Sequence, residues 1–406
     1  MEYHIANGPI AVPQPARDTQ LPAECGHSGC EEPSGLPSGF PSTLYSKLAW
    51  KGSDFKNKDS YVCQLIDEDI AEIKSTLEKF KALELDGDLV NVENFSLPTL
   101  AAKLSGVGHE LHNGKGFSVI RGIKPSDFSV EELTMVWLGI QAHVIDQRGC
   151  QDHKGNMLVH IIANNSSVDM MGHHRHSTSS ISFHNEEAGD CVGWLTRSTP
   201  ASGGRCIISS TYHVYNVLAA YRPDMIRTLA KSDWPFAIPK FQCRPVVFYH
   251  SSKLIMNFGR TPLLGNATHP RPSSLPQVNE WQREALDAIE AIAQATQLEI
   301  TTQAGDMHFI NNMAVLHRRE GFINGATGGE KRHLVRMRLR SSALGWDIPE
   351  ELQSDWQDAF ESTATKAWYL EPMPGDAFPL RKYTKLVGHS KYVWPGRWTS
   401  RVSLLF

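Results

Sequence analysis

A histidine and a glutamate two positions apart form the pair in this sequence that is best suited to chemistry. His184 and Glu186 lie in the run 178–192, Thr-Ser-Ser-Ile-Ser-Phe-His-Asn-Glu-Glu-Ala-Gly-Asp-Cys-Val, which has the pattern of a strand. Side chains at i and i+2 of a strand point to the same face. The pair therefore supplies two of the three ligands of a metal site. Among 18 histidines and 44 acidic residues such pairs also arise by chance, so a third ligand must support the assignment.

His317 is the candidate third ligand. It ends the segment 305–317, in which a Gly-Asp turn leads into a strand and then into a mixed polar and apolar run. Two histidines and one carboxylate on one face of a metal are the ligand set of non-heme iron(II) oxygenases, which leaves positions open for co-substrate and dioxygen. The alternative is a buried histidine bonded to the backbone, and this segment alone does not decide between the two.

An arginine-rich strand supports the metal interpretation. In Arg-His-Leu-Val-Arg-Met-Arg-Leu-Arg, residues 332–340, the arginines and Leu334 alternate onto one face. A guanidinium is always charged and grips a carboxylate with two parallel hydrogen bonds, so Arg332 suits the distal carboxylate of a dicarboxylic co-substrate. For Arg338 and Arg340 we expect a solvated face.

Composition excludes several classes of function. A chain of 406 residues with 41% hydrophobic residues can bury a large core, and its formal charge of −4 gives no basic surface for nucleic acid. Without a secretory leader or an apolar run of membrane-spanning length, we expect a cytoplasmic protein with no membrane partner. Seven cysteines, an odd number, favour reduced thiols. Cys25, His27 and Cys30 form a compact group, but no fourth ligand follows at zinc-finger spacing, so we expect no zinc there.

The pattern along the chain predicts three regions. Residues 1–60 form an irregular arm, residues 61–345 a single domain, and residues 346–406 a tail packed on the core. Apolar periodicity predicts helices over 66–80, 96–111 and 131–144, the last opened by a capping box at Ser129 and Glu132, and a helical insertion near 281–297. Many short strands between turn signals favour a jelly roll, so the fold class is mainly β with flanking helices. The expected strands are 116–123, 157–162, 180–184, 191–196, 206–210, 246–249, 254–258, 298–302, 307–310 and 332–339.

Taken together and in order, the motifs resemble a known family. His184-x-Glu186, Gly305-Asp306, Asn311-Asn312, His317 and Arg332-His-Leu-x-Arg336 are similar to the iron(II)/2-oxoglutarate oxygenases of the taurine dioxygenase and clavaminate synthase type. The likeness extends over roughly residues 115–350 and includes the Gly-Phe-x-Val-Ile-Arg-Gly strand from Gly116. The resemblance implies a double-stranded β-helix that holds Fe(II) through His184, Glu186 and His317. It also implies that 2-oxoglutarate chelates the metal and pairs with Arg332, with O2 as the oxidant.

The same resemblance gives substrate candidates and marks departures. Arg336 matches a position that in relatives anchors an acidic or polar group of the substrate, and weaker substrate candidates are His143, Gln151, Asn164 and Ser180. Cys206 stands where relatives tend to offer a Thr or Ser hydroxyl to 2-oxoglutarate, and a thiol is a weak donor. Either Ser209 or Thr211 takes over that contact, or it is missing. Glu320, where a small residue is common, is expected to pair with Arg318 or Arg319 or to face the substrate.

The implied activity is oxidation of a C–H bond coupled to decarboxylation of 2-oxoglutarate to succinate and CO2. Hydroxylation is the default outcome, with desaturation or cyclisation as variants, and Arg336 favours a small anionic or amino-acid-like metabolite. Two alternatives stay open: a non-catalytic jelly-roll binding or scaffold protein, and a metal enzyme that does not use 2-oxoglutarate, in which Arg332 has no role. The tail tryptophans can cover their own subunit or meet a second copy in a homo-oligomer.

Overall fold

Helices and two main sheets build the part of the protein that the computed structural model describes, namely residues 35–163, 177–266, 269–372 and 377–378. All of these residues belong to the unit Gly35–Phe406. The prediction of strands with flanking helices is confirmed in this coarse form. The helical share is larger than the sequence indicated, so the structure is mixed rather than mainly β.

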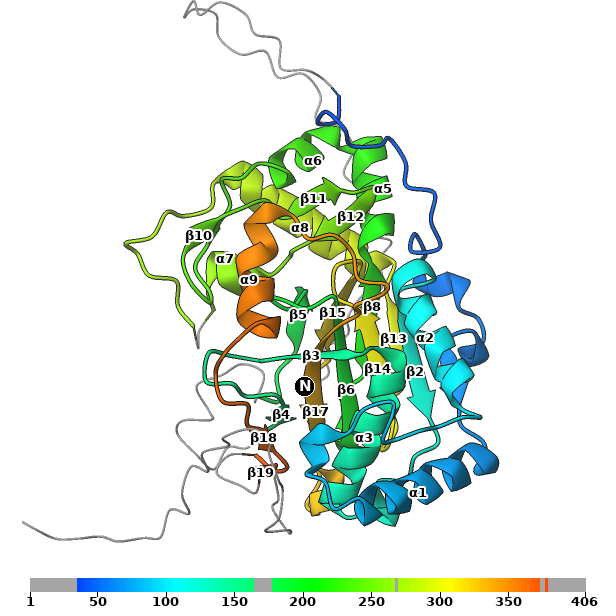
Figure 1. The fold of residues 1–406 in the computed structure, drawn as a ribbon. Coiled ribbons are helices and arrows are strands. Elements are labelled where there is room, and N and C mark those ends of the chain that lie inside the picture. Colours follow the sequence, from blue (N-terminus) through cyan, green and yellow to red (C-terminus); the bar gives the residue numbers. More distant parts are fainter. Residues whose placement is uncertain (1–34, 164–176, 267–268, 373–376, 379–406) are drawn as a thin grey trace, which may run out of the picture. The chain divides into compact units, whose positions relative to one another are not determined.

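Three helices lie in the first part of the described chain, two before β2 (Phe117–Arg121) and one after it, as the apolar periodicity predicted. They are α1 (Asp67–Ala82), α2 (Ala101–Asn113) and α3 (Val130–Val144). Ser129 caps α3: its side chain accepts from the Glu132 backbone N–H, and the Glu132 carboxylate accepts from the Ser129 N–H. Buried side chains of all three helices form one cluster with outward-facing residues of the larger sheet. Figure 1 shows these helices gathered beside β2 (Phe117–Arg121).

The larger sheet has seven strands. Its order is β1-β2-β14-β6-β17-β3, and β4 also pairs with β17. Apart from the parallel pair β1 and β2, neighbouring strands are antiparallel. The strands not yet given are β1 (Val62–Gln64), β3 (Gln147–Gly149), β4 (Val159–Ile162), β6 (Cys191–Ser198), β14 (Met307–Asn311) and β17 (His333–Arg340).

The smaller sheet has four antiparallel strands in the order β13-β8-β15-β5. They are β13 (Leu298–Ile300), β8 (Cys206–Ser210), β15 (Val315–Arg319) and β5 (Ile181–His184). Apolar side chains from both sheets share one buried cluster, which includes Phe117 and Trp194 of the larger sheet with Ile208 and Val315 of the smaller. The inward faces of the two sheets therefore meet across this cluster.

A second layer of helices covers the other face of the smaller sheet. The helical insertion is confirmed as α8 (Glu280–Ala295), whereas α5 (Thr211–Tyr221), α6 (Pro223–Leu229), α7 (Arg260–Leu264) and α9 (Glu350–Phe360) were not predicted. Figure 1 shows α5, α6 and α8 gathered beside the hairpin of β11 (Val247–His250) and β12 (Lys253–Met256). The remaining short strands are β7 (Ser202–Gly203), β9 (Pro235–Phe236), β10 (Gln242–Cys243), β16 (Phe322–Ile323), β18 (Trp368–Tyr369) and β19 (Ala377–Phe378).

The ends of the described chain pack on this body. In the predicted arm, Leu44, Leu48 and Trp50 are buried, and in the predicted tail Trp346, Trp356 and Trp368 are buried. Cys25, His27 and Cys30 lie outside the described residues, as do Trp394 and Trp398. The five cysteines that the structure describes are free thiols. None of the described helices has the length and apolar character needed to cross a bilayer.

Candidate active site

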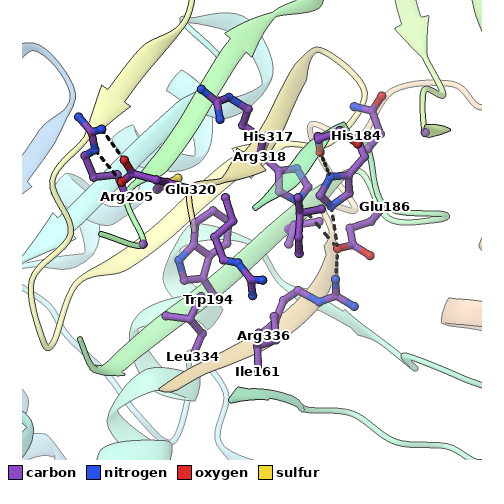
Figure 2. Close-up of a pocket in the computed structure, with 18 of the residues that line it drawn as sticks. Ile161, His184, Glu186, Trp194, Arg205, His317, Arg318, Glu320, Leu334 and Arg336 are labelled. Carbon is purple, nitrogen blue, oxygen red and sulfur yellow. Dashed lines mark hydrogen bonds and ion pairs between the residues drawn. The ribbon is translucent and has the colours of Figure 1, made fainter. Parts of the chain in front are cut away.

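Two strands and one turn bring the three expected metal ligands together. His317 on β15 lies directly opposite His184 on β5, and their ring centroids are 4.2 Å apart. Glu186 Oε1 lies 4.0 Å from His184 Nε2 and 3.8 Å from His317 Nε2. Figure 2 shows the three side chains pointing toward one another, and one ligand atom of each lies within 4.8 Å of the others. Two imidazoles and a carboxylate at this spacing fit a divalent transition metal.

Hydrogen bonds from the chain itself fix the orientation of His184 and of the turn that carries Glu186. His184 Nδ1 lies 2.9 Å from the Ser182 carbonyl oxygen. A proton on Nδ1 donated to that carbonyl leaves the Nε2 lone pair facing the other ligands. Asn312 holds the turn that carries the carboxylate: its Oδ1 accepts from Glu186 N at 2.8 Å, and its Nδ2 donates to the carbonyls of Glu186 and Gly189, each at 3.1 Å.

Asn185, between the two ligands, ties the same turn to two other elements. Its Nδ2 donates to the Asn312 carbonyl at 2.5 Å, and its Oδ1 accepts from Phe258 N at 3.0 Å. Sequence reasoning noted Asn312 only as part of a motif and did not single out Asn185. Their partners lie 73 to 127 residues away in the chain, so no local pattern could reveal these contacts.

Burial sets the protonation state of the second histidine. It lowers the pKa of His317 to about 4. His317 Nδ1 has no hydrogen-bond partner among the described residues. The imidazole is therefore neutral near pH 7, which is the form that binds a metal.

A cavity of about 630 Å³ opens beside the three ligands. This volume lies in the range of small-molecule sites. Both sheets contribute to its wall, together with the loop that follows β12. Residues of the wall that bear on the chemistry are His184, Glu186, Glu187, Trp194, Thr196, Cys206, His317, Arg319, Arg332, Leu334 and Arg336.

Arg332 enters the cavity as a buried cation. Its residue is 9% exposed, and its guanidinium has no hydrogen-bond or ion-pair partner within the described part of the chain. It lies over the Phe322 ring, 5.4 Å from the centroid. Burial, together with the nearby Arg319 charge, lowers the pKa of Arg332 to about 9. A buried charge without a counter-charge is costly, so the site fits a ligand that brings a carboxylate.

Arg336, on the same face of β17, contacts the metal-ligand carboxylate. Its Nη1 donates to Glu186 Oε1, and its Nη2 donates to Gln151 Oε1 at 3.2 Å. Gln151 Nε2 is buried and has no partner among the described residues. Figure 2 shows Arg336 directed at Glu186. The structure thus brings two predicted substrate residues together beside the metal ligands.

The expectation of a solvated face for the last arginines of β17 is wrong for Arg338. This residue is 8% exposed, and it donates to Glu187 Oε2 at 3.1 Å and to the Cys150 carbonyl at 3.2 Å. The segment after β5 and the end of β3 cover that part of β17, which a single strand pattern cannot show. Arg340 is half-buried, 3.9 Å from Asp190 Oδ1.

Neither hydroxyl expected to replace the contact at Cys206 reaches the cavity. Cys206 does line it, and burial raises the pKa of its thiol to about 12, so the thiol stays protonated. Ser209 faces away, with its Oγ 3.5 Å from Thr296 Oγ1, because residues of β8 alternate between the faces of the sheet. The Thr211 hydroxyl donates to the Ala314 carbonyl at 2.9 Å.

Gln151, His143 and Ser180 lie outside the cavity wall. His143 Nε2 contacts the Phe95 carbonyl at 2.8 Å, and Ser180 is exposed just before β5. Asn164 belongs to the residues that the structure does not describe. Glu320 does line the cavity, but its ion pair is with Arg205 rather than with Arg318 or Arg319, with oxygen–nitrogen distances of 2.6 and 2.9 Å.

The chain resembles known proteins in sequence. The family model of the taurine catabolism dioxygenase TauD, TfdA family matches residues 78–338. The taurine hydroxylase-like protein SAT17 of Stachybotrys chartarum is 30% identical over 345 residues, which cover 82% of this chain and 89% of that protein. FR-33289 synthase of Streptomyces rubellomurinus is 22% identical over 56% of this chain and 70% of its own length.

Solved structures share the fold. Asparagine oxygenase, solved with Fe(II), 3-hydroxyasparagine and succinate, matches with a TM-score of 0.54 at 17% identity, over 70% of this chain and 98% of its own. The non-heme iron oxygenase OrfP, solved with Fe, succinate and (3S)-hydroxy-L-Arg, matches with a TM-score of 0.52 at 14% identity, over 69% of this chain and 94% of its own. From the family match and the fungal relative, the chain belongs to the TauD/TfdA family of iron(II)/2-oxoglutarate-dependent oxygenases, with iron(II), 2-oxoglutarate and dioxygen as its cofactors.

Proposed function

We propose that the protein couples decarboxylation of 2-oxoglutarate, to succinate and CO2, to hydroxylation of a C–H bond in a small anionic, amino-acid-like metabolite. The observation that carries the proposal is the buried guanidinium of Arg332, which lacks a counter-charge among the described residues and lies in the same cavity as two histidines and a carboxylate. A metal site without a dicarboxylic co-substrate gives no reason for this cation.

In this proposal residues 61–345 form a double-stranded β-helix domain, with the two sheets as its walls. His184, Glu186 and His317 hold iron(II), which supplies the oxidative chemistry when bound. The shared buried cluster between the sheets and the mutual approach of the three ligand atoms support this assignment. The protein's part is to orient the ligands, bind both substrates and exclude water.

Arg332 binds the distal carboxylate of 2-oxoglutarate. The guanidinium offers paired donors, and a carboxylate there relieves the cost of a buried unpaired cation. Arg332 immediately precedes β17, and Arg336 lies four residues further along, about 13 Å away at 3.3 Å per residue. Arg336 touches Glu186 at the metal end, so Arg332 marks the far end of the co-substrate.

Arg336 and Gln151 recognise the primary substrate. Arg336 contributes a positive charge beside the metal ligands, and Gln151 contributes an amide N–H with no partner among the described residues. The Arg336 guanidinium, which lines the cavity, suits a carboxylate of the substrate, and Gln151, which does not line it, accepts from that guanidinium and orients it. The asparagine and arginine derivatives named in the solved neighbours agree with an amino-acid-like molecule.

The test is a coupled assay with the iron-loaded enzyme. Purified protein is given iron(II), 2-oxoglutarate and members of a panel of amino acids and small carboxylic acids, and succinate and product masses are measured after oxygen is added. We expect at least one acid to raise succinate formation and to gain one oxygen atom. Arg336→Met should lose this stimulation while 2-oxoglutarate binding persists, and Arg340→Met on the same strand should behave like the wild type.

Two results would count against the proposal. Succinate that never forms, although iron and 2-oxoglutarate bind, would contradict the coupled reaction. Stimulation that only a cationic or neutral compound without a carboxylate produces, and that Arg336→Met leaves intact, would remove the anionic substrate class and the role of Arg336.

A further inference from the structure

A second polar group in the cavity wall lacks a partner. The residue Thr196 is 1% exposed, and its Oγ1 is buried without a hydrogen bond to any described residue. A buried hydroxyl without a hydrogen-bond partner destabilises the folded state. Thr196 nevertheless lines the cavity that holds the candidate metal ligands. Such a group in a binding wall calls for an acceptor on the ligand.

The backbone of Thr196 is fixed, whereas its hydroxyl is not. Thr196 N donates to the Asp306 carbonyl at 2.8 Å, and the Thr196 carbonyl accepts from Gly305 N at 2.7 Å. One rotation about χ1 exchanges the methyl and hydroxyl groups of a threonine. Since no hydrogen bond to a described residue holds Oγ1, it can turn to an acceptor in the cavity without movement of the strand.

Strand register places Thr196 between the metal ligands and Arg332. On the paired strands β6 and β17, Trp194 lies opposite Arg336, and Thr196 lies opposite Leu334. Arg332 precedes Leu334 by two residues and faces the same cavity. The register shifts between His333 and Leu334, so Arg332 lies just before β17 and beyond the regular ladder, but Thr196 and Arg332 both line the cavity, where one ligand can contact both. Figure 2 marks this inward face with Trp194, Leu334 and Arg336.

At position 206, in the wall that also contains Arg332, the chain has a thiol instead of a hydroxyl. Cys206 and Arg332 both line the cavity, but the buried thiol stays protonated and is a weak donor. Ser209 and Thr211 are turned elsewhere. The Ser198 hydroxyl, two residues after Thr196, donates to the Lys331 carbonyl.

We propose that Thr196 donates a hydrogen bond to the distal carboxylate of 2-oxoglutarate, beside Arg332, in place of the hydroxyl that is absent at Cys206. The inference rests on the proposed function, in which Arg332 binds that carboxylate. It adds a positioning residue from β6 that the sequence did not single out. The carboxylate then receives donors from two adjacent strands, which fixes its plane as well as its distance.

The experiment compares 2-oxoglutarate affinity in the wild type and in Thr196→Val, which keeps the shape and removes the hydroxyl. The iron(II) protein is titrated anaerobically with 2-oxoglutarate, and the visible charge-transfer band of the chelate is followed. We expect the dissociation constant for 2-oxoglutarate to rise about 10- to 100-fold in Thr196→Val, because the lost hydrogen bond joins the hydroxyl to a charged group. Thr196→Ser, which restores the hydroxyl, should recover wild-type affinity.

A stability measurement separates binding from packing. Without 2-oxoglutarate, Thr196→Val should be at least as stable as the wild type in urea, because the unpaired hydroxyl is gone. Ser209→Ala, the matched change on the outward face of β8, should leave 2-oxoglutarate affinity unchanged. A merely structural role for the Thr196 hydroxyl would instead lower the stability of Thr196→Val.

The outcomes are distinguishable. A wild-type band with equal affinity in Thr196→Val would overturn the inference and leave the proposed function standing. Weaker binding in both Thr196→Val and Thr196→Ser would assign the effect to shape and would also overturn it. Absence of the band in the wild type would overturn the proposed function together with the inference.

Discussion

The two walls of the cavity differ in how their polar groups are satisfied. In the metal wall, formed by His184, Glu186 and His317, the chain orients His184 through the Ser182 carbonyl and the Glu186 turn through Asn312, and only His317 Nδ1 lacks a partner among the described residues. In the anion wall, formed by Thr196 and Arg332, the guanidinium and the hydroxyl have no partner among the described residues. Two of the three metal ligands are thus held in place by the chain before any ligand arrives, whereas the anion wall is completed by a ligand.

Burial acts on both walls with different consequences. It lowers the pKa of His317 to about 4, which keeps the imidazole neutral and ready to bind a metal. It lowers the pKa of Arg332 to about 9, which still leaves the guanidinium charged near pH 7. The same physical cause therefore yields a neutral donor in the metal wall and an uncompensated cation in the anion wall.

The largest effect should come from the metal wall. We expect His184→Ala or His317→Ala to abolish iron-dependent succinate formation, because two ligands cannot hold the metal in place. Each variant should still unfold cooperatively, since neither imidazole belongs to the apolar core clusters. Iron content and turnover measure the effect, and full turnover in either variant would remove that residue from the ligand set.

The next effect tests how the metal wall is organised. Asn312→Ala removes three hydrogen bonds to the turn around Glu186 and leaves the buried Glu186 N–H without its acceptor. We expect a loss of about 2–4 kcal/mol in the free energy of unfolding and a 10–100-fold weaker iron affinity. Denaturant unfolding and iron titration measure the two quantities.

Asn312→Asp is the control for this change. It keeps the acceptor for Glu186 N but loses the two N–H donors, so its iron affinity should lie between those of the wild type and Asn312→Ala. Wild-type iron affinity in Asn312→Ala would show that iron binding does not depend on the three hydrogen bonds of the Asn312 side chain.

Local sequence patterns predicted some helices and strands correctly, but they could not predict contacts between segments that are distant in the chain. Local periodicity was sufficient for α1, α3 and α8, and the alternation of β17 correctly put Arg332 and Arg336 on one face. The helix α5 was missed because its aromatic and β-branched residues are poor helix formers that tertiary packing stabilises. The hydrogen bonds between Asn312 and the Glu186 turn, and the burial of Arg338, bring together segments that are distant in the chain. No local sequence pattern predicts such contacts.

A polar cluster of the larger sheet outside the cavity gives a smaller, pH-dependent effect. His160 Nε2 donates to the Tyr369 carbonyl at 2.7 Å, and His160 Nδ1 accepts from His333 Nε2 at 2.9 Å. Burial lowers the pKa of His160 to about 4. Below its ordinary pKa of 6.5 the unfolded chain therefore binds a proton that the folded chain does not, so stability falls as pH drops from about 6.5 toward 4.

We expect the wild type to lose about 2 kcal/mol more unfolding free energy between pH 7 and pH 5 than His160→Gln, which does not titrate. Urea unfolding at the two pH values measures the difference. Equal losses in both proteins would contradict the claim that burial keeps His160 neutral in the folded chain. The hydrogen-bonding groups of His160 find their partners within the chain, whereas those of the anion wall have none among the described residues.

The most direct test of the account is the anaerobic titration of iron(II) protein with 2-oxoglutarate in the wild type, in Arg332→Gln and in Arg340→Gln. We expect a visible charge-transfer band in the wild type and in Arg340→Gln. In Arg332→Gln the band should be lost or much weaker, although iron still binds. A band of undiminished affinity in Arg332→Gln, or iron binding without any band in the wild type, would contradict the assignment of this wall to 2-oxoglutarate.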